Sequence, residues 1–178
     1  GFQSNVFTGA AFTLANAGKQ SSDGIEIDVL WAATDNLELS FSGTFMDPEY
    51  DDFRNSAVGD ISGQKPAGIH EMSMSFAGTY YFEAGPFSGS LRADYLYEDE
   101  VQVVDNIANT IASREVGLLN ASIRLIYEDQ YEITLWGRNL TDDQFLLSAF
   151  PSVAQTGSVS GYPNQPRTYG VTFRAHFQ

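Results

Sequence analysis

Apolar and polar residues alternate along most of this chain. In the first clear run, residues 25–31, every second side chain is apolar, and Glu26 and Asp28 lie between them. Successive side chains of a β-strand point to opposite faces, so this pattern predicts a strand with one apolar and one polar face. The segments that show the pattern are 25–31, 37–45, 72–82, 91–98, 119–127, 131–135 and 169–177, with a shorter strand expected at Phe2–Phe7.

Short turn sequences join these segments in pairs. Thr34-Asp35-Asn36, Ala84-Gly85-Pro86 and Glu128-Asp129-Gln130 each separate two alternating segments. Asp, Asn, Gly and Pro favour tight turns, so each pair is predicted to be a β-hairpin. We therefore expect an all-β fold of about eight antiparallel strands, organised as one unit over residues 1–178.

Much longer polar connections lie between the hairpins. They run from about Asp51 to Ala67, from Val101 to Arg114 and from Thr141 to Gln165. Outer-membrane β-barrels have short turns on the periplasmic side and long loops outside the cell. The pattern thus predicts a segment of an antiparallel transmembrane β-barrel with a periplasmic carboxy terminus. A soluble β-sandwich also alternates, but its strands usually have about five or six residues, fewer than several segments here.

The composition is compatible with a membrane barrel. Hydrophobic residues make up 43% of the chain and aromatic residues 13%, yet the mean hydropathy is −0.20. No apolar run approaches the roughly 18 residues of a membrane-spanning helix, whereas a barrel strand needs only alternate apolar positions. Aromatic side chains that we expect near the membrane interfaces are Trp31, Phe45, Tyr80, Phe82, Tyr95, Tyr97, Tyr127 and Tyr131.

Charge and cysteine content exclude several classes of function. The net charge of −14 argues against nucleic acid as a partner, because binding to phosphates rests on clustered Lys and Arg. The absence of cysteine excludes thiolate metal sites and cysteine nucleophiles. Gly1-Phe2-Gln3 does not resemble a signal peptide, so we expect an exported fragment whose signal was removed or lay upstream.

Two acidic clusters are candidate calcium sites, because Ca²⁺ prefers carboxylate oxygens. One cluster contains Asp47, Glu49, Asp51 and Asp52, and the other is Glu98-Asp99-Glu100. Neither has the spacing of an EF-hand, and acidic runs are usually solvated surface. The sequence therefore predicts neither a bound metal nor a cofactor.

The two histidines, His70 and His176, are expected at opposite ends of the strands and cannot share a metal ion. An enzyme would place His70 at the outer rim beside a serine and a carboxylate. No G-x-S-x-G motif supports a hydrolase, so we do not predict an enzyme.

One segment favours a helix. Thr141 followed by Gln144 fits a capping box, and three apolar residues begin at Phe145. A short helical turn is therefore predicted at the start of the last long connection.

Two motifs carry a family resemblance. The first is Trp136-Gly137-Arg138-Asn139-Leu140-Thr141-Asp142, and the second, some twenty-five residues later, is Pro166-Arg167-Thr168-Tyr169-Gly170-Val171, before the terminal aromatic Phe177. Together they resemble the carboxy terminus of TonB-dependent receptors. Further upstream, Asn16-Ala17-Gly18, Asp23-Gly24-Ile25-Glu26-Ile27, Tyr50-Asp51-Asp52-Phe53 and Pro66-Ala67-Gly68-Ile69-His70 extend the resemblance to nearly the whole chain.

The resemblance implies structural roles for the motif residues Asn139, Leu140, Thr141, Asp142, Pro166, Arg167, Thr168, Tyr169 and Gly170. Asn139 and Asp142 suit the exit from a strand, where they bind nearby backbone. Pro166 suits a strand start, and Gly170 leaves space beside a neighbour. On the polar face, Arg167 and Arg174 are expected to pair with carboxylates such as Glu132 or Glu26.

The resemblance also implies a function. Such receptors import a scarce nutrient, often a ferric siderophore or similar iron complex, using energy supplied through TonB. The implied partners are outer-membrane lipid, the nutrient, the TonB complex through an amino-terminal plug absent from this chain, and the barrel-assembly machinery, which reads Phe177 although Gln178 follows it. Possible ligand contacts in the last loop are Phe145, Phe150 and Tyr162. The alternative is a complete eight-stranded outer-membrane barrel of structural or adhesive type.

Overall fold

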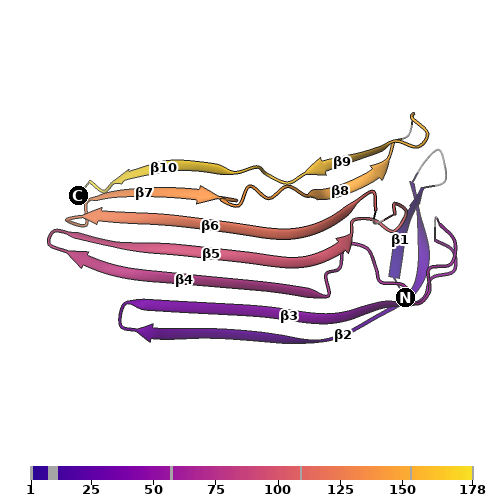
Figure 1. Ribbon diagram of the computed structural model, residues 1–178, viewed down its shortest axis with the longest axis horizontal. Helices are drawn as coiled ribbons and strands as arrows, with labels where there is room; N and C mark the ends of the chain where they lie inside the picture. The colour runs from indigo at the N-terminus through magenta and orange to yellow at the C-terminus, as the bar shows by residue number, and fades with distance from the viewer. Residues whose placement is uncertain (1, 8–11, 57, 109, 153, 178) are drawn as a thin grey trace.

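The chain is all-β in the computed structural model, which describes residues 2–7, 12–56, 58–108, 110–152 and 154–177 (Figure 1). These ranges contain strands and connections but no helix. The strands are β1 (Phe2–Phe7), β2 (Phe12–Thr34), β3 (Leu37–Asp52), β4 (Met72–Ala84), β5 (Phe87–Gln102), β6 (Ser113–Tyr127), β7 (Tyr131–Arg138), β8 (Leu146–Pro151), β9 (Val159–Pro163) and β10 (Thr168–Ala175).

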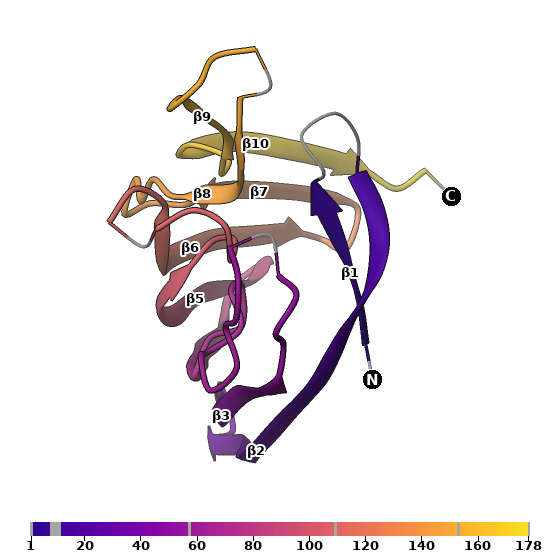
Figure 2. The same ribbon diagram turned by 90° about the vertical axis from the view of Figure 1, so that its right-hand side faces the viewer.

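Eight strands form one antiparallel sheet in the order β1-β2-β3-β4-β5-β6-β7-β10. β8 and β9 form a separate hairpin within the connection between β7 and β10. The three predicted hairpins and the final strand are confirmed. Viewed along the strands, the sheet curves into an open arc (Figure 2), and β1 and β10 are not paired with each other in the described ranges.

One face of the sheet is continuously apolar. Ile25 lies opposite Phe45, Phe41 lies opposite Phe76, and the same face continues through Tyr95. Its side chains are open to the surroundings, as in Ile25, which is 65% exposed. Farther along the sheet, this face includes Ile123, Leu135, Val171 and Phe173. The predicted alternation is therefore confirmed across the strands from β2 to β10.

The opposite, polar face lines the concave side of the arc. Tyr50 lies on the polar side of β3, in step with Ser42 and Thr44, and is buried with Phe53 and Ile61. Phe53 and Ile61 belong to the β3–β4 connection, which lies inside the arc (Figure 2). The connection therefore covers one end of the polar face.

Short turns and long connections gather at opposite ends of the sheet (Figure 1). The β2–β3, β4–β5 and β6–β7 turns lie at one end, together with the carboxy terminus. His176 lies at this turn end, where its backbone N–H donates to the carbonyl of Gln130, and His70 lies at the loop end. The predicted separation of the two histidines is confirmed.

No helix in the described part of the chain is long and apolar enough to cross a membrane.

Two predictions about local structure need correction. β2 begins at Phe12 rather than near residue 25. Its first part, residues 12–24, pairs with β1 and β3 but is too polar to show the alternation that predicts a strand. The helical turn predicted at Thr141–Gln144 is wrong, since a turn and an irregular stretch lead directly into β8. The Thr141 hydroxyl donates to the carbonyl of Gly117 on β6 and does not cap a helix.

Candidate functional site: the loop end of the sheet

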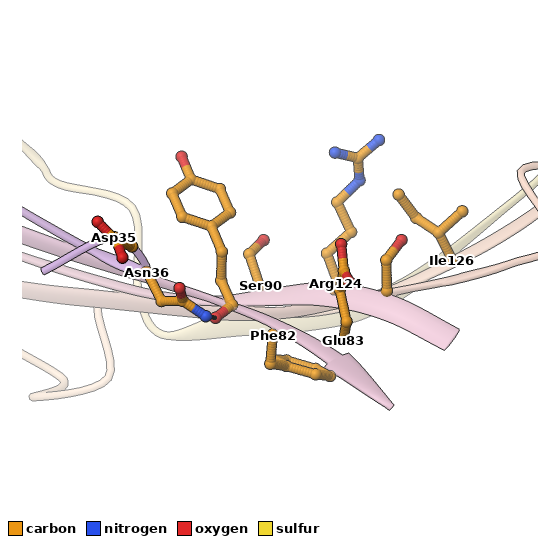
Figure 3. Close-up of a pocket in the computed structure, with 10 residues that line it drawn as sticks. Asp35, Asn36, Phe82, Glu83, Ser90, Arg124 and Ile126 are labelled. Carbon is orange, nitrogen blue, oxygen red and sulfur yellow. Dashed lines mark hydrogen bonds between the residues drawn. The ribbon is translucent and has the colours of Figure 1, made fainter. Parts of the chain in front are cut away.

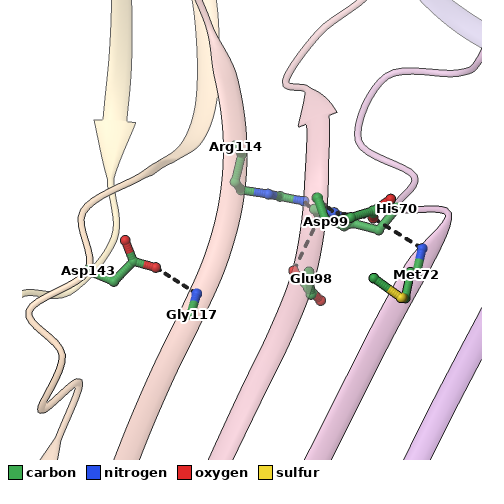
Figure 4. A network of polar contacts seen from close by, with 7 residues as sticks. All are labelled: His70, Met72, Glu98, Asp99, Arg114, Gly117 and Asp143. Carbon is green, nitrogen blue, oxygen red and sulfur yellow. Dashed lines mark hydrogen bonds and ion pairs between the residues drawn. The ribbon is translucent and has the colours of Figure 1, made fainter.

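The loop end begins where β7 stops along β6. Pairing between these strands ends at Ala121 and Gly137, although β6 starts at Ser113, so its last part needs another partner on that edge. The backbone N–H of Leu140 donates to the carbonyl of Leu119 at 2.7 Å. Thr141 and Asp143 then bind the carbonyl and the N–H of Gly117, at 2.7 and 2.6 Å. Side chains thus replace a neighbouring strand at Gly117 (Figure 4).

Asn139 organises this turn. Its backbone has a φ of 51°, a left-handed conformation that Asn tolerates better than most residues. Asn139 is only 5% exposed. Its Oδ1 accepts from the N–H of Asp143 at 2.9 Å, and its Nδ2 donates to the carbonyls of Asp143 and Gln165 at 2.9 and 3.1 Å. Asn139 therefore ties the exit of β7 to the chain that enters β10.

Asp142 ties the same two segments a second time. Its Oδ1 accepts from the backbone N–H of Arg167 at 3.2 Å, and its Oδ2 lies 3.6 Å from the guanidinium of Arg167. Pro166, just before Arg167, is exposed. Asn139 and Asp142 thus both bind backbone groups of the segment that leads into β10. The pairing of Arg167 with Glu132 or Glu26 is wrong, because Asp142 is much closer along this turn.

Gly170 allows Trp136 to lie across β10. The two residues are opposite each other in the β7–β10 register, and a Cβ on Gly170 would come within 2.5 Å of Cζ2 of Trp136. The indole Nε1 donates to the hydroxyl of Thr172 at 3.3 Å. The expected close approach beside Gly170 thus involves the tryptophan of the first motif.

The turn end of the polar face carries a cluster centred on Glu132, a residue that is only 6% exposed. Glu132 accepts from Arg124 on β6 at 2.6 Å and from Arg174 on β10 at 3.2 Å. The predicted pairing of Arg174 with Glu132 is therefore confirmed. Figure 3 shows Arg124 beside the polar hollow near Asn36 and Ser90, whereas Phe82 points to the opposite side of the sheet.

Two long connections at the loop end are joined through Asp105. Tyr50 donates its hydroxyl to Oδ2 of Asp105 at 2.9 Å, and the backbone N–H of Ala67 donates to Oδ1 at 3.0 Å. The N–H of Gly68 donates to the carbonyl of Gln102 at 2.8 Å. The β3–β4 and β5–β6 connections therefore form one packed unit. No motif in the sequence pointed to Asp105, because a single loop carboxylate carries no periodic signal.

The β8–β9 hairpin joins this packed unit. Ala149 is 3% exposed and packs with Val103, Ile107 and Ala112 of the β5–β6 connection. The other side of the hairpin is open, and Leu147 is 54% exposed. The hairpin therefore presents one buried side and one accessible side.

The three predicted ligand-contact residues lie in or beside this hairpin. Phe150 and Tyr162 are diagonal neighbours across the two strands, with ring centroids 5.8 Å apart, and Tyr162 is exposed. Phe145 precedes β8 and is half-buried, with its backbone N–H donating to Asn164. The structure thus brings Phe150 and Tyr162 together, whereas Phe145 belongs to the base of the hairpin.

Neither candidate calcium site is assembled. Asp51 accepts from the hydroxyl of Ser21 at 2.6 Å, Asp52 pairs with Arg54 at 3.1 Å, and Glu98 and Asp99 face His70. Within the residues that the structure describes, no three acidic or histidine side chains are grouped to hold a metal ion.

Charged side chains of the β3–β4 connection pair locally. Hydrogen bonds from Ser62 lower the pKa of Asp60. Lys65 donates a hydrogen bond to the carboxylate of Glu71, and this contact raises the pKa of the lysine. Both local contacts favour the charged forms of these side chains.

His70 is nearly buried between β5 and β6. Its ring contacts the backbone carbonyl of Asp99, the carboxylates of Asp99 and Glu98, and the guanidinium of Arg114. These partners occupy both ring nitrogens. The rim hydrolase considered from the sequence would need one of them to activate a serine, so the geometry gives that hypothesis no support.

Long antiparallel strands with an apolar outer face, short turns at one end and packed loops at the other are the features of a segment of a transmembrane β-barrel. A family model described as TonB dependent receptor-like, beta-barrel matches residues 1–140. The chain therefore belongs to the TonB-dependent receptor family, whose members are receptors and transporters of the outer membrane.

Two solved structures share the fold. The ferric yersiniabactin uptake receptor FyuA from Yersinia pestis matches 93% of this chain with a TM-score of 0.76 at 15% identity. BauA, the ferric preacinetobactin receptor from Acinetobacter baumannii, matches 97% of it with a TM-score of 0.61 at 16% identity. The chain spans 25% of the length of each. No match was found among curated protein sequences.

Proposed function

We propose that this chain forms the carboxy-terminal part of the barrel of an outer-membrane receptor that imports a scarce nutrient. A ferric siderophore, or a similar iron complex, is the ligand class that the proposal names. Family membership supports a receptor. The names of FyuA and BauA describe uptake or binding of ferric chelates by those proteins and support the choice of ligand.

The packed loops carry the proposal. Three connections that are far apart in sequence form one body over the polar concave face, held by Asp105 and by the packing of Ala149. On its open side, Leu147 and Tyr162 are exposed. Aromatic and apolar groups on a rigid frame suit a bulky, partly apolar ligand, because little conformational entropy is lost on binding.

The proposed orientation places the loop end outside the cell and the carboxy terminus in the periplasm. The apolar outer face would contact lipid, with aromatic side chains near its borders. Phe177 is 90% exposed just after β10 and is available for the barrel-assembly machinery. Contact with TonB belongs to an amino-terminal plug outside these 178 residues.

The alternative of a complete eight-stranded barrel finds no support in the sheet. A closed barrel requires its first and last strands to pair, and β1 and β10 are not neighbours in the described sheet. The open arc instead fits one portion of a wider barrel.

Uptake of radioactive iron supplied as different siderophore complexes tests the proposal in the native bacterium. Deletion of the gene should abolish uptake of one complex, and a proton uncoupler should do the same in the wild type. The double change Phe150→Ala and Tyr162→Ala in the full-length receptor should weaken binding about tenfold or more, since each aromatic contact contributes roughly 1 kcal/mol. Val58→Ala, at an exposed site in another connection, is the matched control. Unchanged uptake of every complex in the deletion strain would contradict an iron-chelate receptor.

A further inference from the structure

A hollow opens on the outer face of the sheet at the loop end, beside the part of β6 that β7 does not reach. Its volume is about 420 Å³, and it is lined by Tyr95 and Tyr97 of β5, Glu115 of β6 and residues 141–144. Tyr95 lies opposite Leu119 on the apolar face. The hollow therefore belongs to the face that would meet lipid and not to the polar concave face.

The floor of the hollow is backbone, because residue 117 is a glycine. Gly117 lies opposite Tyr97 in the β5–β6 register. A Cβ on Gly117 would lie 3.1 Å from the hydroxyl oxygen of Tyr95 and 3.6 Å from Oδ2 of Asp143. The N–H of Gly117 donates to that oxygen of Asp143 and fixes the carboxylate beside the floor (Figure 4). Aromatic and carboxylate groups thus stand around an open patch of main chain.

Distance along β5 places the hollow at the border of the apolar outer face. Near the turn end, the Phe87 ring contacts that of Tyr127, with centroids 5.2 Å apart. The stretch from Phe87 to Tyr97 is about 33 Å long at roughly 3.3 Å per residue. With the tilt of about 40° usual for barrel strands, it crosses about 25 Å, the height of the apolar band. The hollow therefore lies at the level of the lipid headgroups.

The charge of the hollow disfavours an anionic ligand. The described residues that line it include Glu115, Asp142 and Asp143 but no lysine or arginine. Arg167 offsets only Asp142, at 3.6 Å. A phosphate or carboxylate ligand would be repelled by the remaining negative charge. Hydroxyl groups, in contrast, can donate to carboxylates, and such charge-assisted hydrogen bonds are strong. The hollow therefore favours an uncharged ligand that carries several hydroxyl groups.

A sugar ring combines hydroxyl groups at its rim with an apolar C–H face. Tyr95 is exposed, and a ring that packs on it can bury much of this face. Tyr97 already shares a side-chain hydrogen bond with Glu115, so one hydroxyl is accepted here within the protein itself. An acyl chain in the same place would bury the carboxylates without hydrogen bonds, which is unfavourable.

We propose that this hollow binds the sugar headgroup of a neutral glycolipid in the outer leaflet of the membrane. Tyr95 and Tyr97 pack on the ring, and Glu115 and Asp143 accept hydrogen bonds from its hydroxyls. The acyl chains then lie along the apolar face beside Leu119. The inference rests on the orientation in the proposed function, with the loop end outside the cell, but it does not depend on the imported nutrient.

Native mass spectrometry of the full-length receptor tests the site. The receptor is purified in lauryldimethylamine oxide, a detergent without sugar, and receives monoglucosyl diacylglycerol or phosphatidylglycerol with the same acyl chains. The wild type should retain severalfold more of the glycolipid. Glu115→Gln keeps the shape but removes the charge, so it should lower glycolipid retention about threefold or more and raise that of phosphatidylglycerol.

The two tyrosine positions of the outer face separate a site from general contact with lipid. Tyr97→Ala should lower glycolipid retention about threefold or more, whereas Tyr97→Phe, which keeps the ring and tests a variant that folds more readily, should lower it less. Tyr80→Ala is the matched control, because Tyr80 is exposed on the same face but does not line the hollow. Equal losses in Tyr97→Ala and Tyr80→Ala would overturn the proposal.

Two further outcomes would also overturn it. One is equal retention of both lipids by the wild type. The other is displacement of the glycolipid by an equal concentration of methyl glucoside, which would show that the hollow binds free sugar rather than a membrane lipid. The measurement contains no iron complex, so its failure would leave nutrient import untouched, and a failure of the uptake experiment would leave this result standing.

Discussion

At the scale of single residues, the motif after β7 works through backbone groups. Asn139 and Asp143 supply hydrogen bonds to chain segments that have no strand beside them. The sequence predicted that Asn139 and Asp142 would bind nearby backbone, because Asn and Asp do so at strand exits. The distant partners, Gln165 for Asn139 and Arg167 for Asp142, could not be predicted, since hydrogen bonds across 26 or 25 positions leave no local pattern.

Substitutions at Asn139 should separate its two contributions. Asn139→Gly keeps the left-handed backbone but loses the side-chain hydrogen bonds, at a cost of about 2 kcal/mol in unfolding free energy. Asn139→Ala also imposes the strain of a positive φ, which adds about 1 kcal/mol. Urea titration of the full-length receptor, followed by tryptophan fluorescence, measures both values. Equal stability of the two variants would show that backbone conformation at this position is unimportant.

Gly170 should tolerate no larger side chain while Trp136 is present. Gly170→Ala places a Cβ against the indole, and overpacking of this kind costs about 1–3 kcal/mol. Trp136→Leu removes the ring, so adding Gly170→Ala to it should cost much less. A double-mutant cycle on the unfolding free energy measures this coupling. An equal cost of Gly170→Ala in both backgrounds would contradict a direct clash.

At the scale of elements, the hairpins of the sheet were predictable and the β8–β9 hairpin was not. The alternation of β4, β5 and β6 persists because one face is apolar and the other polar along their length. β8 and β9 pair only with each other, and Ala149 packs on another connection. Their sequence therefore reflects contacts with a loop rather than a two-faced sheet, and a helix was predicted nearby instead.

Disruption of the Ala149 contact should release the hairpin and leave the sheet intact. Ala149→Glu places a charge within the apolar cluster, which is unfavourable without a partner. Hydrogen exchange over residues 145–163 should rise severalfold, while peptides from β4 and β5 stay protected. Leu147→Glu is the control on the same strand, because its side chain is exposed. Similar exchange in both variants would show that the hairpin is not held by this packing.

At the scale of the whole molecule, the apolar outer face, the turn end and the loop end determine the orientation that the protein can take in a membrane. The sequence predicted all three, since alternation and connection length are both visible along the chain. It did not reveal that Asp105, His70 and Ala149 join the long connections into one body. Those contacts depend on how the sheet curves, which the pattern of a single strand does not contain.

The orientation of the receptor in the outer membrane provides the most direct test of the account. Thr156 is exposed in the β8–β9 hairpin, and Gln130 is exposed in the β6–β7 turn. The test uses two variants, Thr156→Cys and Gln130→Cys. A membrane-impermeant maleimide, applied to intact cells that produce the full-length receptor, should label the cysteine at 156. It should label the cysteine at 130 only after the outer membrane is permeabilised. Labelling of position 130 but not of position 156 in intact cells would invert the orientation and remove the proposed nutrient-binding loops from the cell surface.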